Sequence, residues 1–322
     1  MRFIVYGVGA VGGTIASRLA LSGREVVGIA RGAMLEAIRA GGLRFTSVEG
    51  VKTVRFPCFA DPAECGFRDD DVILLTMKSQ DTEGALVRLR GAGAYGQPVV
   101  CAQNGVANER IALRHFPHVY GMTVMLPAQY STPGAVEAFG APKYGLFDIG
   151  RFPSGADEVA SGIASNLNAV GFDCEIDSDV MKSKYGKLLL NVGNIVGAAL
   201  GTKARFGPWY DAARREAEKV YEAAGIAAGD VDFESPRREL MKIVEIAGVE
   251  RSGSSSLQSL IRGAGSIETN YLNGEIVLLG RLNGVPTPVN TALCRVALRM
   301  IAEEIPAGSF PEEDIAPLVA AS

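Results

Sequence analysis

Histidine is scarce in this chain. The 322 residues include 2 histidines, His115 and His118, and both lie in one short segment. Histidine is the most frequent general base and the commonest metal ligand in proteins. A mechanism built on a histidine base or on several histidine ligands is therefore nearly excluded outside that segment. If the chain is an enzyme, its proton transfers should depend on lysine or on carboxylates.

Cysteines at the spacings typical of disulfide frameworks or zinc sites are also missing. The five cysteines are an odd number and contain no C-x-x-C pair, which favours neither a disulfide framework nor a zinc site. We expect reduced thiols in a cytoplasmic protein and no metal. The five are Cys58, Cys65, Cys101, Cys174 and Cys294.

Long apolar runs and an excess of positive charge are absent too. The run from Leu188 to Leu200 is shorter than the about 20 residues that span a bilayer, and the apolar stretch over 3–21 is interrupted by glycines and Arg18. The formal net charge is −4, so neither nucleic acid nor an anionic membrane is favoured as a partner. We expect a small-molecule partner. The oligomeric state stays open, with a homodimer as one option.

The composition is that of a globular protein, with 48% hydrophobic and 21% charged residues, and the length suits two domains. In the N-terminal half, short apolar runs alternate with helical patterns, which predicts a parallel sheet wrapped by helices. The first predicted helix places Val11, Ile15 and Leu19 on one stripe. Strands are predicted at 2–6, 25–30, 72–76, 98–101 and 119–124, with a helix at 82–90.

Two further strands, 134–139 and 144–149, are joined by a short Gly/Pro connection and suggest an antiparallel hairpin. After residue 177 the pattern becomes mainly helical, for example over 216–224 and 236–246. The predicted fold class is α/β: an N-terminal Rossmann-type doubly wound domain over 1–177, followed by a mainly helical domain over 178–322.

A glycine-rich loop follows the first predicted strand. Its sequence is Gly7-Val8-Gly9-Ala10-Val11-Gly12, a G-x-G-x-x-G motif placed between a strand and an amphipathic helix. Glycines there let the backbone approach a pyrophosphate, which the first amides of the helix can bind. The alternative is an ordinary glycine turn, but the position of the motif favours a dinucleotide.

The second strand ends without an acid. An NAD site usually has Asp or Glu there to bind the ribose 2′-hydroxyl, whereas this chain has Arg31, which suits a 2′-phosphate. We therefore predict NADP(H) rather than NAD(H). A plain surface arginine is the alternative.

Two polar residues follow later strands. Lys78, one of nine lysines, comes two residues after the strand at 72–76, and Asn104 follows the strand at 98–101 in the same way. Doubly wound sheets bind ligands at these carboxyl ends. Turn chemistry explains Asn104-Gly105 well and Lys78 poorly.

The strongest signal in the second half is the segment 179–201, for which we predict a helix. Lys187, Asn191 and Asn194 fall at i, i+4 and i+7 and share one face of that helix. Their neighbours are apolar, so the polar stripe borders buried surface, where an unpaired polar group costs about 1–3 kcal/mol. A ligand or an internal backbone partner would satisfy it.

Taken together, these residues resemble the ketopantoate reductase family over nearly the whole chain. The matching segments are the glycine loop, Lys78, 103–105, 133–136, 187–191, the serine cluster at 254–256 and 267–274. The resemblance implies Lys187 as general acid and Asn104 as a contact on the substrate or nicotinamide side. It also implies Lys78 and Glu268 near the cofactor, with Asn191, Asn194 and Ser256 on the substrate.

The sequence departs from the family pattern on the substrate side. The second helix asparagine falls three rather than four residues after Asn191, and Ile195 occupies the usual place. The asparagine that some members carry beyond this helix is absent from 203–209, and Ser259 replaces a common aspartate.

The implied reaction is reduction of a 2-oxo acid, foremost 2-dehydropantoate, by NADPH. One alternative is an NADP-dependent dehydrogenase of another 2-oxo or β-hydroxy acid, because β-hydroxyacid dehydrogenases also place a helix lysine four residues before an asparagine. A protein that binds NADP as a sensor without turnover is the non-enzyme alternative.

Overall fold

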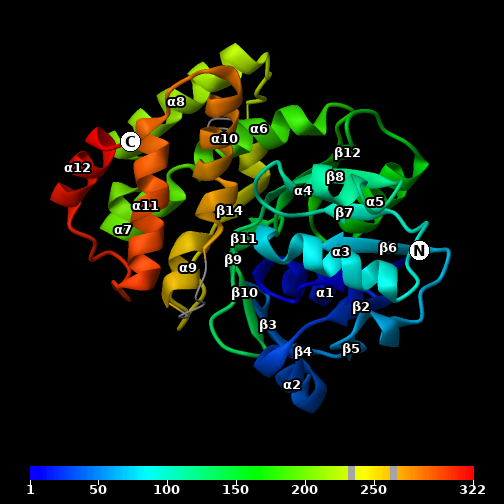
Figure 1. The fold of residues 1–322 in the computed structure, drawn as a ribbon. Coiled ribbons are helices and arrows are strands. Elements are labelled where there is room, and N and C mark those ends of the chain that lie inside the picture. The colour runs from blue at the N-terminus through cyan, green and yellow to red at the C-terminus, as the bar shows by residue number, and fades with distance from the viewer. Residues whose placement is uncertain (231–235, 262–266) are drawn as a thin grey trace. The chain divides into compact units, whose positions relative to one another are not determined.

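A computed structural model describes residues 1–230, 236–261 and 267–322 (Figure 1). Its contacts form two compact units. The first comprises Met1–Gln103, Asn108–Met181 and the described part of Phe233–Glu250, and the second comprises Asn104–Ala107, the described part of Lys182–Asp232, and that of Arg251–Ser322. The chain passes into the second unit within helix α6 (Val180–Asn191), just after the boundary predicted at residue 177.

The first unit contains an eight-stranded sheet in the order β13-β12-β8-β7-β6-β1-β2-β5. Neighbouring strands are parallel except β12, which runs antiparallel to β8. The strands are β1 (Arg2–Tyr6), β2 (Val26–Ile29), β5 (Cys58–Phe59), β6 (Asp71–Leu75), β7 (Val99–Cys101), β8 (Val119–Met125), β12 (Leu146–Arg151) and β13 (Asp173–Ile176). The five strands predicted at 2–6, 25–30, 72–76, 98–101 and 119–124 are thereby confirmed, with ends that differ by at most one residue.

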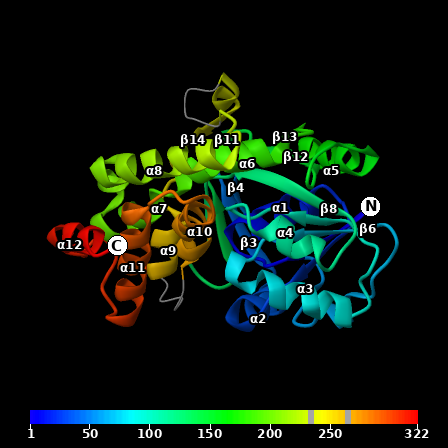
Figure 2. The same ribbon diagram turned by 45° about the horizontal axis from the view of Figure 1, so that its top comes forward.

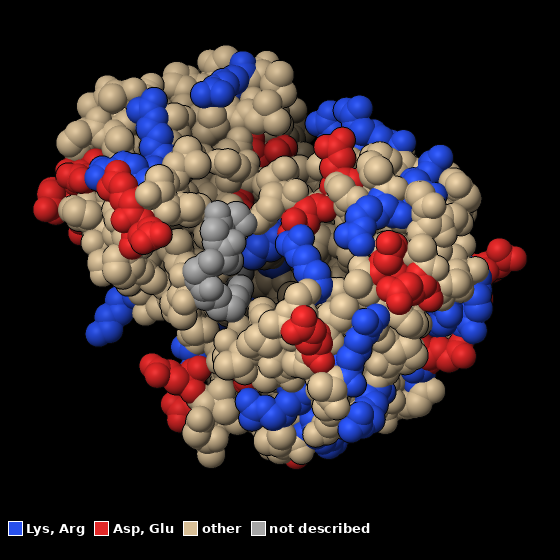
Figure 3. All heavy atoms as spheres, turned by 60° about the horizontal axis from the view of Figure 1, so that its bottom comes forward, with Lys and Arg blue, Asp and Glu red and all other residues tan. Residues whose placement is uncertain are grey.

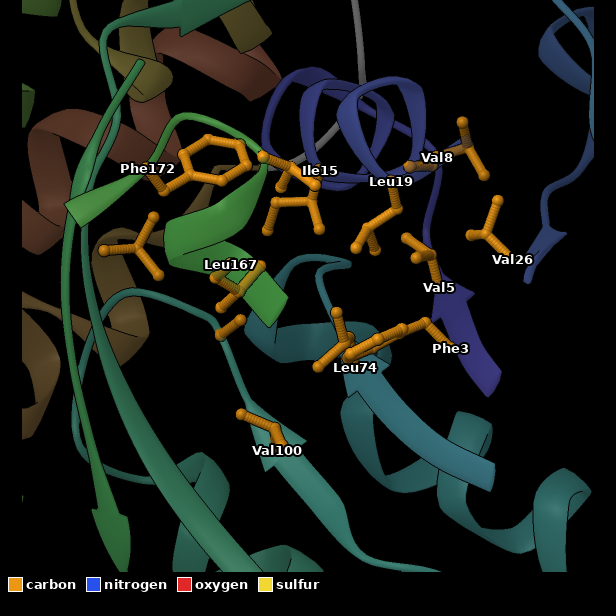
Figure 4. Packing of buried hydrophobic residues seen from close by; sticks show 14 of the residues in the cluster. Phe3, Val5, Val8, Ile15, Leu19, Val26, Leu74, Val100, Leu167 and Phe172 are labelled. Carbon is orange, nitrogen blue, oxygen red and sulfur yellow. The ribbon is translucent and has the colours of Figure 1, made fainter. Parts of the chain in front are cut away.

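Successive side chains of each strand point to opposite faces of the sheet, so the hydrophobic core is divided between the two faces. On β1, Phe3 and Val5 face a cluster that includes residues of α1 and α5, whereas Ile4 faces a cluster that includes residues of α3 and α4. Figure 4 shows Ile15 and Leu19 of α1 directed toward Val5 of the sheet. Helices on both faces make this a doubly wound domain. The helices are α1 (Ala10–Leu21), α2 (Gly32–Gly41), α3 (Thr82–Gly91), α4 (Asn108–Leu113) and α5 (Glu158–Ala169).

The predicted hairpin over 134–149 is wrong. Its two halves lie in different sheets: β10 (Ala135–Ala138) belongs to a four-stranded sheet in the order β4-β3-β10-β9, and β12 belongs to the large one. β10 pairs in parallel with β3, and a side chain on Gly140 would collide with the carbonyl of Tyr144, so the chain turns sharply between the two sheets. The remaining strands are β3 (Leu43–Ser47), β4 (Gly50–Val54) and β9 (Ala128–Gln129).

A helix was predicted over 236–246, and this expectation is also wrong. The segment forms a 3₁₀ turn, η4 (Pro236–Leu240), and a strand, β14 (Met241–Ile243), which pairs with β11 (Gly140–Pro142) of the first unit. Arg237 fixes it by donating to Asp148, to Asp173 Oδ2 at 2.6 Å and to the carbonyl of Phe147 at 2.7 Å. Strand pairing and these ion pairs outweigh the helical pattern of the segment.

The second unit is mainly helical, and in Figure 2 α10 and α11, which pack together, lie side by side. The predicted fold class, a Rossmann-type domain followed by a mainly helical one, is therefore confirmed. Among the described residues, no helix is both long and apolar enough to cross a membrane. The helices are α6, α7 (Asn194–Leu200), α8 (Pro208–Ala224), α9 (Ser255–Ile261), α10 (Asn273–Asn283), α11 (Pro288–Ala302) and α12 (Ile315–Ala320).

Candidate active site

The glycine loop joins β1 to α1 and leaves its backbone open. Gly7 has φ +103°, and a Cβ on it would lie 2.6 Å from the amide nitrogen of Met77. A Cβ on Gly12 would collide with the carbonyl of Gly7 and the hydroxyl of Thr76, whereas one on Gly9 would meet nothing within 4 Å. The first and last glycines are thus required by packing, and the middle one faces open space.

The loop is tied to the end of β6. Thr76 Oγ1 lies 2.8 Å from the carbonyl oxygen of Gly7, to which it donates, and 3.0 Å from that of Tyr6. Gly9 is the N-cap of α1 and offers no side chain to its first amides. Those amides and the positive end of the helix dipole suit a phosphate group. Lys78 follows two residues after Thr76, so the loop and this lysine lie on adjacent connections.

Arg31 is the N-cap residue of α2, directly beyond β2, and its side chain is 83% exposed. Its Nη2 donates to Asp81 Oδ2 at 3.1 Å. An exposed ion pair of this kind contributes little stability, so the guanidinium can exchange Asp81 for a phosphate at low cost. The position is the one expected for a residue that contacts the adenosine ribose.

Lys187 and Asn104 are brought together in the second unit. Lys187, on α6, is half-buried, and its Nζ donates to Oδ1 of Asn104 at 2.8 Å. The next residue, Gly105, has φ +80°, and a Cβ there would lie 2.8 Å from the carbonyl oxygen of Tyr271. Glycine at 105 therefore lets the segment 104–107 pack closely against the turn η5 (Glu268–Tyr271).

The predicted helix over 179–201 is interrupted. α6 ends at Asn191 and α7 begins at Asn194, with Val192 and Gly193 between them. A Cβ on Gly193 would lie 2.7 Å from the carbonyl oxygen of Arg205 and 2.8 Å from the ring of Tyr210. The break thus allows a close approach of the following chain that a side chain would prevent.

The three predicted substrate contacts are buried polar side chains. Asn191, Asn194 and Ser256 are 5%, 4% and 1% exposed. Within the described residues, neither Asn194 Oδ1 nor Ser256 Oγ has a hydrogen-bond partner. A buried polar atom without a partner is costly, so both atoms are suited to hydrogen-bond a ligand. The neighbouring Ser254 has a structural role, because its Oγ accepts from the amide of Leu257 at the start of α9.

Sequence reasoning did not single out a buried amide network behind the α6–α7 break. Asn273 Nδ2 donates to the carbonyl of Val192 and to Oδ1 of Asn290, both at 3.0 Å. Asn290 Nδ2 in turn donates to Glu216 Oε2 at 2.8 Å. Asn273 lies in the segment 267–274, whose match to the family pattern could have drawn attention to it. Asn290 and Glu216 lie in no segment of the sequence that matches that pattern.

Glu268 is the first residue of η5 and is 5% exposed. It shares this turn with Tyr271, against which Gly105 packs, so it lies near the segment that carries Asn104.

In the first unit, the structure brings together the glycine loop and the connection that carries Lys78. In the second, it brings together Lys187 with Asn104 and, through helices α7 and α9, Asn194 with the serine cluster. No group of three or more metal-binding side chains occurs in the described parts of the chain.

Two family models match the chain. Residues 3–154 match the model described as ketopantoate reductase PanE/ApbA, and residues 179–300 match its C-terminal counterpart. Two curated relatives are called 2-dehydropantoate 2-reductase, one from Pyrococcus horikoshii and one from Archaeoglobus fulgidus. Each is 28% identical to this chain, over 296 and 298 residues, and each alignment covers 91% of this chain and 95% of the relative.

Solved structures share the fold. A PanE/ApbA family ketopantoate reductase from Ralstonia eutropha JMP134 is 29% identical, with a TM-score of 0.76 over 94% of this chain and 99% of the other. A D-mandelate dehydrogenase with NADH and anilino(oxo)acetate has a TM-score of 0.78 over 94% and 99%, at 23% identity, which is evidence of fold alone.

Proposed function

This chain belongs to the ketopantoate reductase family, and we propose that it reduces a 2-oxo acid to the 2-hydroxy acid with NADPH. As a member, it is an oxidoreductase that acts on a small molecule. The substrate named for the relatives, 2-dehydropantoate, is the first to test. The observation that carries the proposal is the hydrogen bond between Lys187 Nζ and Asn104 Oδ1 in the helical unit.

Lys187 is proposed as the general acid. The cofactor, when bound, supplies a hydride to the carbonyl carbon, and negative charge develops on the carbonyl oxygen. A protonated lysine stabilises that charge by hydrogen bonding and then donates its proton to the oxygen. The lysine ammonium carries three N–H donors, so it can hydrogen-bond the substrate oxygen while it also donates to Asn104. The amide of Asn104 accepts one ammonium hydrogen and so fixes the direction of Nζ.

Asn191, Asn194 and Ser256 are proposed to bind the substrate. Their burial, and the unpartnered Asn194 Oδ1 and Ser256 Oγ, support this role. All three are neutral, so they can hydrogen-bond substrate oxygens without competing for the proton of Lys187.

The cofactor is proposed to bind along the glycine loop, Gly7-Val8-Gly9-Ala10-Val11-Gly12, with Lys78 and Glu268 as further contacts. The uncapped start of α1 and the open space at Gly9 fit a pyrophosphate. Arg31 supports NADPH because its guanidinium can form a bidentate, charge-assisted contact with a 2′-phosphate.

Consumption of NADPH with a panel of 2-oxo acids that includes 2-dehydropantoate tests this function. We expect the absorbance of NADPH to fall with at least one member of the panel. Activity that is highest with 2-dehydropantoate would select the narrow function. Activity confined to another 2-oxo or β-hydroxy acid would support the alternative dehydrogenase, and tight NADPH binding with no turnover on any acid would support a binding protein.

A further inference from the structure

Arg205 lies against the α6–α7 break. It belongs to the 3₁₀ turn η3 (Thr202–Phe206), which packs along α7. Glycines make room for it: a Cβ on Gly197 would lie 3.0 Å from Cβ of Arg205, and one on Gly193 would lie 2.7 Å from its carbonyl oxygen. The arginine is therefore held beside the start of α7, where Asn194 lies.

The charge of Arg205 has no counter-charge in the described parts of the chain. Its Nε is buried without a hydrogen-bond partner, and its guanidinium lies 4.7 Å from the centre of the Phe206 ring. Burial, followed by the positive charge of Arg251, lowers the pKa of Arg205. A guanidinium nevertheless stays protonated in proteins, so among the described residues Arg205 is a cation without a counter-charge.

Arg251 adds a second positive charge. The segment that carries it lies against η3, because a Cβ on Gly253 would come within 3.0 Å of Thr202 Cγ2. No ion pair joins Arg251 to a carboxylate among the described residues. Two neighbouring cations without an acid repel each other, and a shared anion would replace that repulsion with attraction.

The arginine pair borders the proposed substrate contacts. Ser254, three residues after Arg251, lies with its Oγ 3.5 Å from the carbonyl oxygen of Asn194. Ser256 follows on α9, which packs against α7. The unpartnered Asn194 Oδ1 and Ser256 Oγ therefore belong to the same part of the helical unit as the two arginines.

We propose that Arg205 and Arg251 bind an anionic group at the end of the substrate remote from its carbonyl, so that the preferred substrates are 2-oxo diacids. This rests on the proposed function. The carboxylate of any 2-oxo acid is bonded to the carbonyl carbon and so stays beside Lys187. Gly193, against which Arg205 packs, lies beyond the end of α6, six residues after Lys187. A second carboxylate, at the far end of the substrate, can therefore reach Arg205 more easily than the carboxylate bonded to the carbonyl carbon.

An anion site at Arg205 fits one of the departures from the family pattern on the substrate side. Arg205 lies within 203–209, the segment that lacks the asparagine carried by some members of the family. An asparagine suits an uncharged end such as the hydroxymethyl group of 2-dehydropantoate, whereas an arginine favours a carboxylate.

Binding of two matched, unreactive acids tests the site without turnover. Glutarate carries a carboxylate at each end, and pentanoate has the same number of carbons with one carboxylate. In isothermal titration of the full chain, we expect glutarate to bind roughly 10- to 100-fold more tightly, and Arg205→Gln or Arg251→Gln to remove that difference. Arg215→Gln, an exposed arginine of α8, is the matched control for the loss of one charge and should keep it.

Kinetics with 2-oxoglutarate and 2-oxopentanoate test the role in the reaction. We expect the ratio of their kcat/KM values to favour 2-oxoglutarate and to fall roughly 10- to 100-fold in Arg205→Gln, with the change mainly in KM. Arg205→Lys keeps the charge and should retain part of the preference, which separates loss of binding from loss of folding.

Three outcomes decide the matter. Equal loss of activity toward both acids in Arg205→Gln would mean that the pair binds the carboxylate next to the carbonyl, and would overturn the inference. Equal binding of glutarate and pentanoate by the unmodified protein would overturn it as well. Binding of glutarate that depends on Arg205, with no reduction of any 2-oxo acid, would support the anion site while the proposed function fails.

Discussion

Arg31 is the residue on which the choice of cofactor depends. Its guanidinium is exposed and engaged only weakly by Asp81, so a 2′-phosphate can replace that carboxylate. Sequence placed Arg31 correctly at the end of the second strand, because a strand of four buried residues followed by a helix leaves little freedom in its position. Its pairing with Asp81 could not be predicted, since the two are separated by 50 residues.

We predict that Arg31→Ala weakens NADPH binding by about 10- to 100-fold, the range for hydrogen bonds to a charged group, and leaves NADH binding nearly unchanged. Fluorescence titration with each nucleotide measures both constants. The exposed Arg114→Ala, also in the first unit, serves as the charge control. An unchanged ratio of the two affinities would remove Arg31 from cofactor selection.

The position of Asn104 depends on its neighbour, Gly105. A left-handed backbone costs an L-residue about 1–2 kcal/mol, and a Cβ at 105 would also press on the carbonyl oxygen of Tyr271. We predict that Gly105→Ala lowers the free energy of unfolding by at least that amount and reduces turnover, because it displaces Asn104. Urea denaturation measures the first effect. Gly96→Ala, where a Cβ would meet nothing within 4 Å, should leave both stability and turnover intact.

At the scale of elements, the break between α6 and α7 shows where sequence reasoning stops. The polar stripe of Lys187, Asn191 and Asn194 predicts a continuous helix. Nothing within 179–201 reveals that the carbonyl of Val192 is held by Asn273. That bond joins residues 81 positions apart, and periodicity carries information only about neighbours along the chain.

The same limit explains the segment 236–246. Its local pattern is helical, yet it forms a strand because β11 and the carboxylates of Asp148 and Asp173 offer it partners. Tertiary contacts of this kind override helix propensities, which are worth less than 1 kcal/mol per residue.

We predict that Asn273→Ala destabilises the helical unit by about 1–3 kcal/mol, since it leaves the buried carbonyl of Val192 and the amide of Asn290 short of a partner. Thermal or urea unfolding measures the loss. Asn283→Ala, on the exposed end of α10, removes only a hydrogen bond within the helix and should stay within about 0.5 kcal/mol of the unmodified protein. Equal effects of the two variants would contradict a role for the network at the break.

For the whole molecule, the arrangement of the first unit could be predicted well. Short buried strands alternating with amphipathic helices admit few arrangements, and the doubly wound sheet is one of them. The side sheet could not be foreseen, because β3 and β10 are far apart in sequence and pair in parallel. Figure 3 shows acidic and basic side chains interspersed over one face of the molecule, in keeping with the near-balanced charge.

The cysteines of the whole molecule should be inert. Burial raises the pKa of Cys58 to about 11 and those of Cys65, Cys174 and Cys294 to about 12. Cys101 is fully buried. Since the thiolate is the reactive form and forms only as pH approaches these values, we predict no rapid reaction with a chromogenic thiol reagent at pH 8 and five reactive thiols after denaturation. Rapid labelling of several thiols in the native protein would contradict this.

Turnover of Lys187→Ala with NADPH and the best 2-oxo acid of the panel tests the central claim most directly. The claim is that this lysine, and no histidine, delivers the proton. It predicts a fall in kcat on the order of 10²- to 10⁴-fold, with NADPH binding preserved because the glycine loop is untouched. Turnover close to that of the unmodified protein would contradict it.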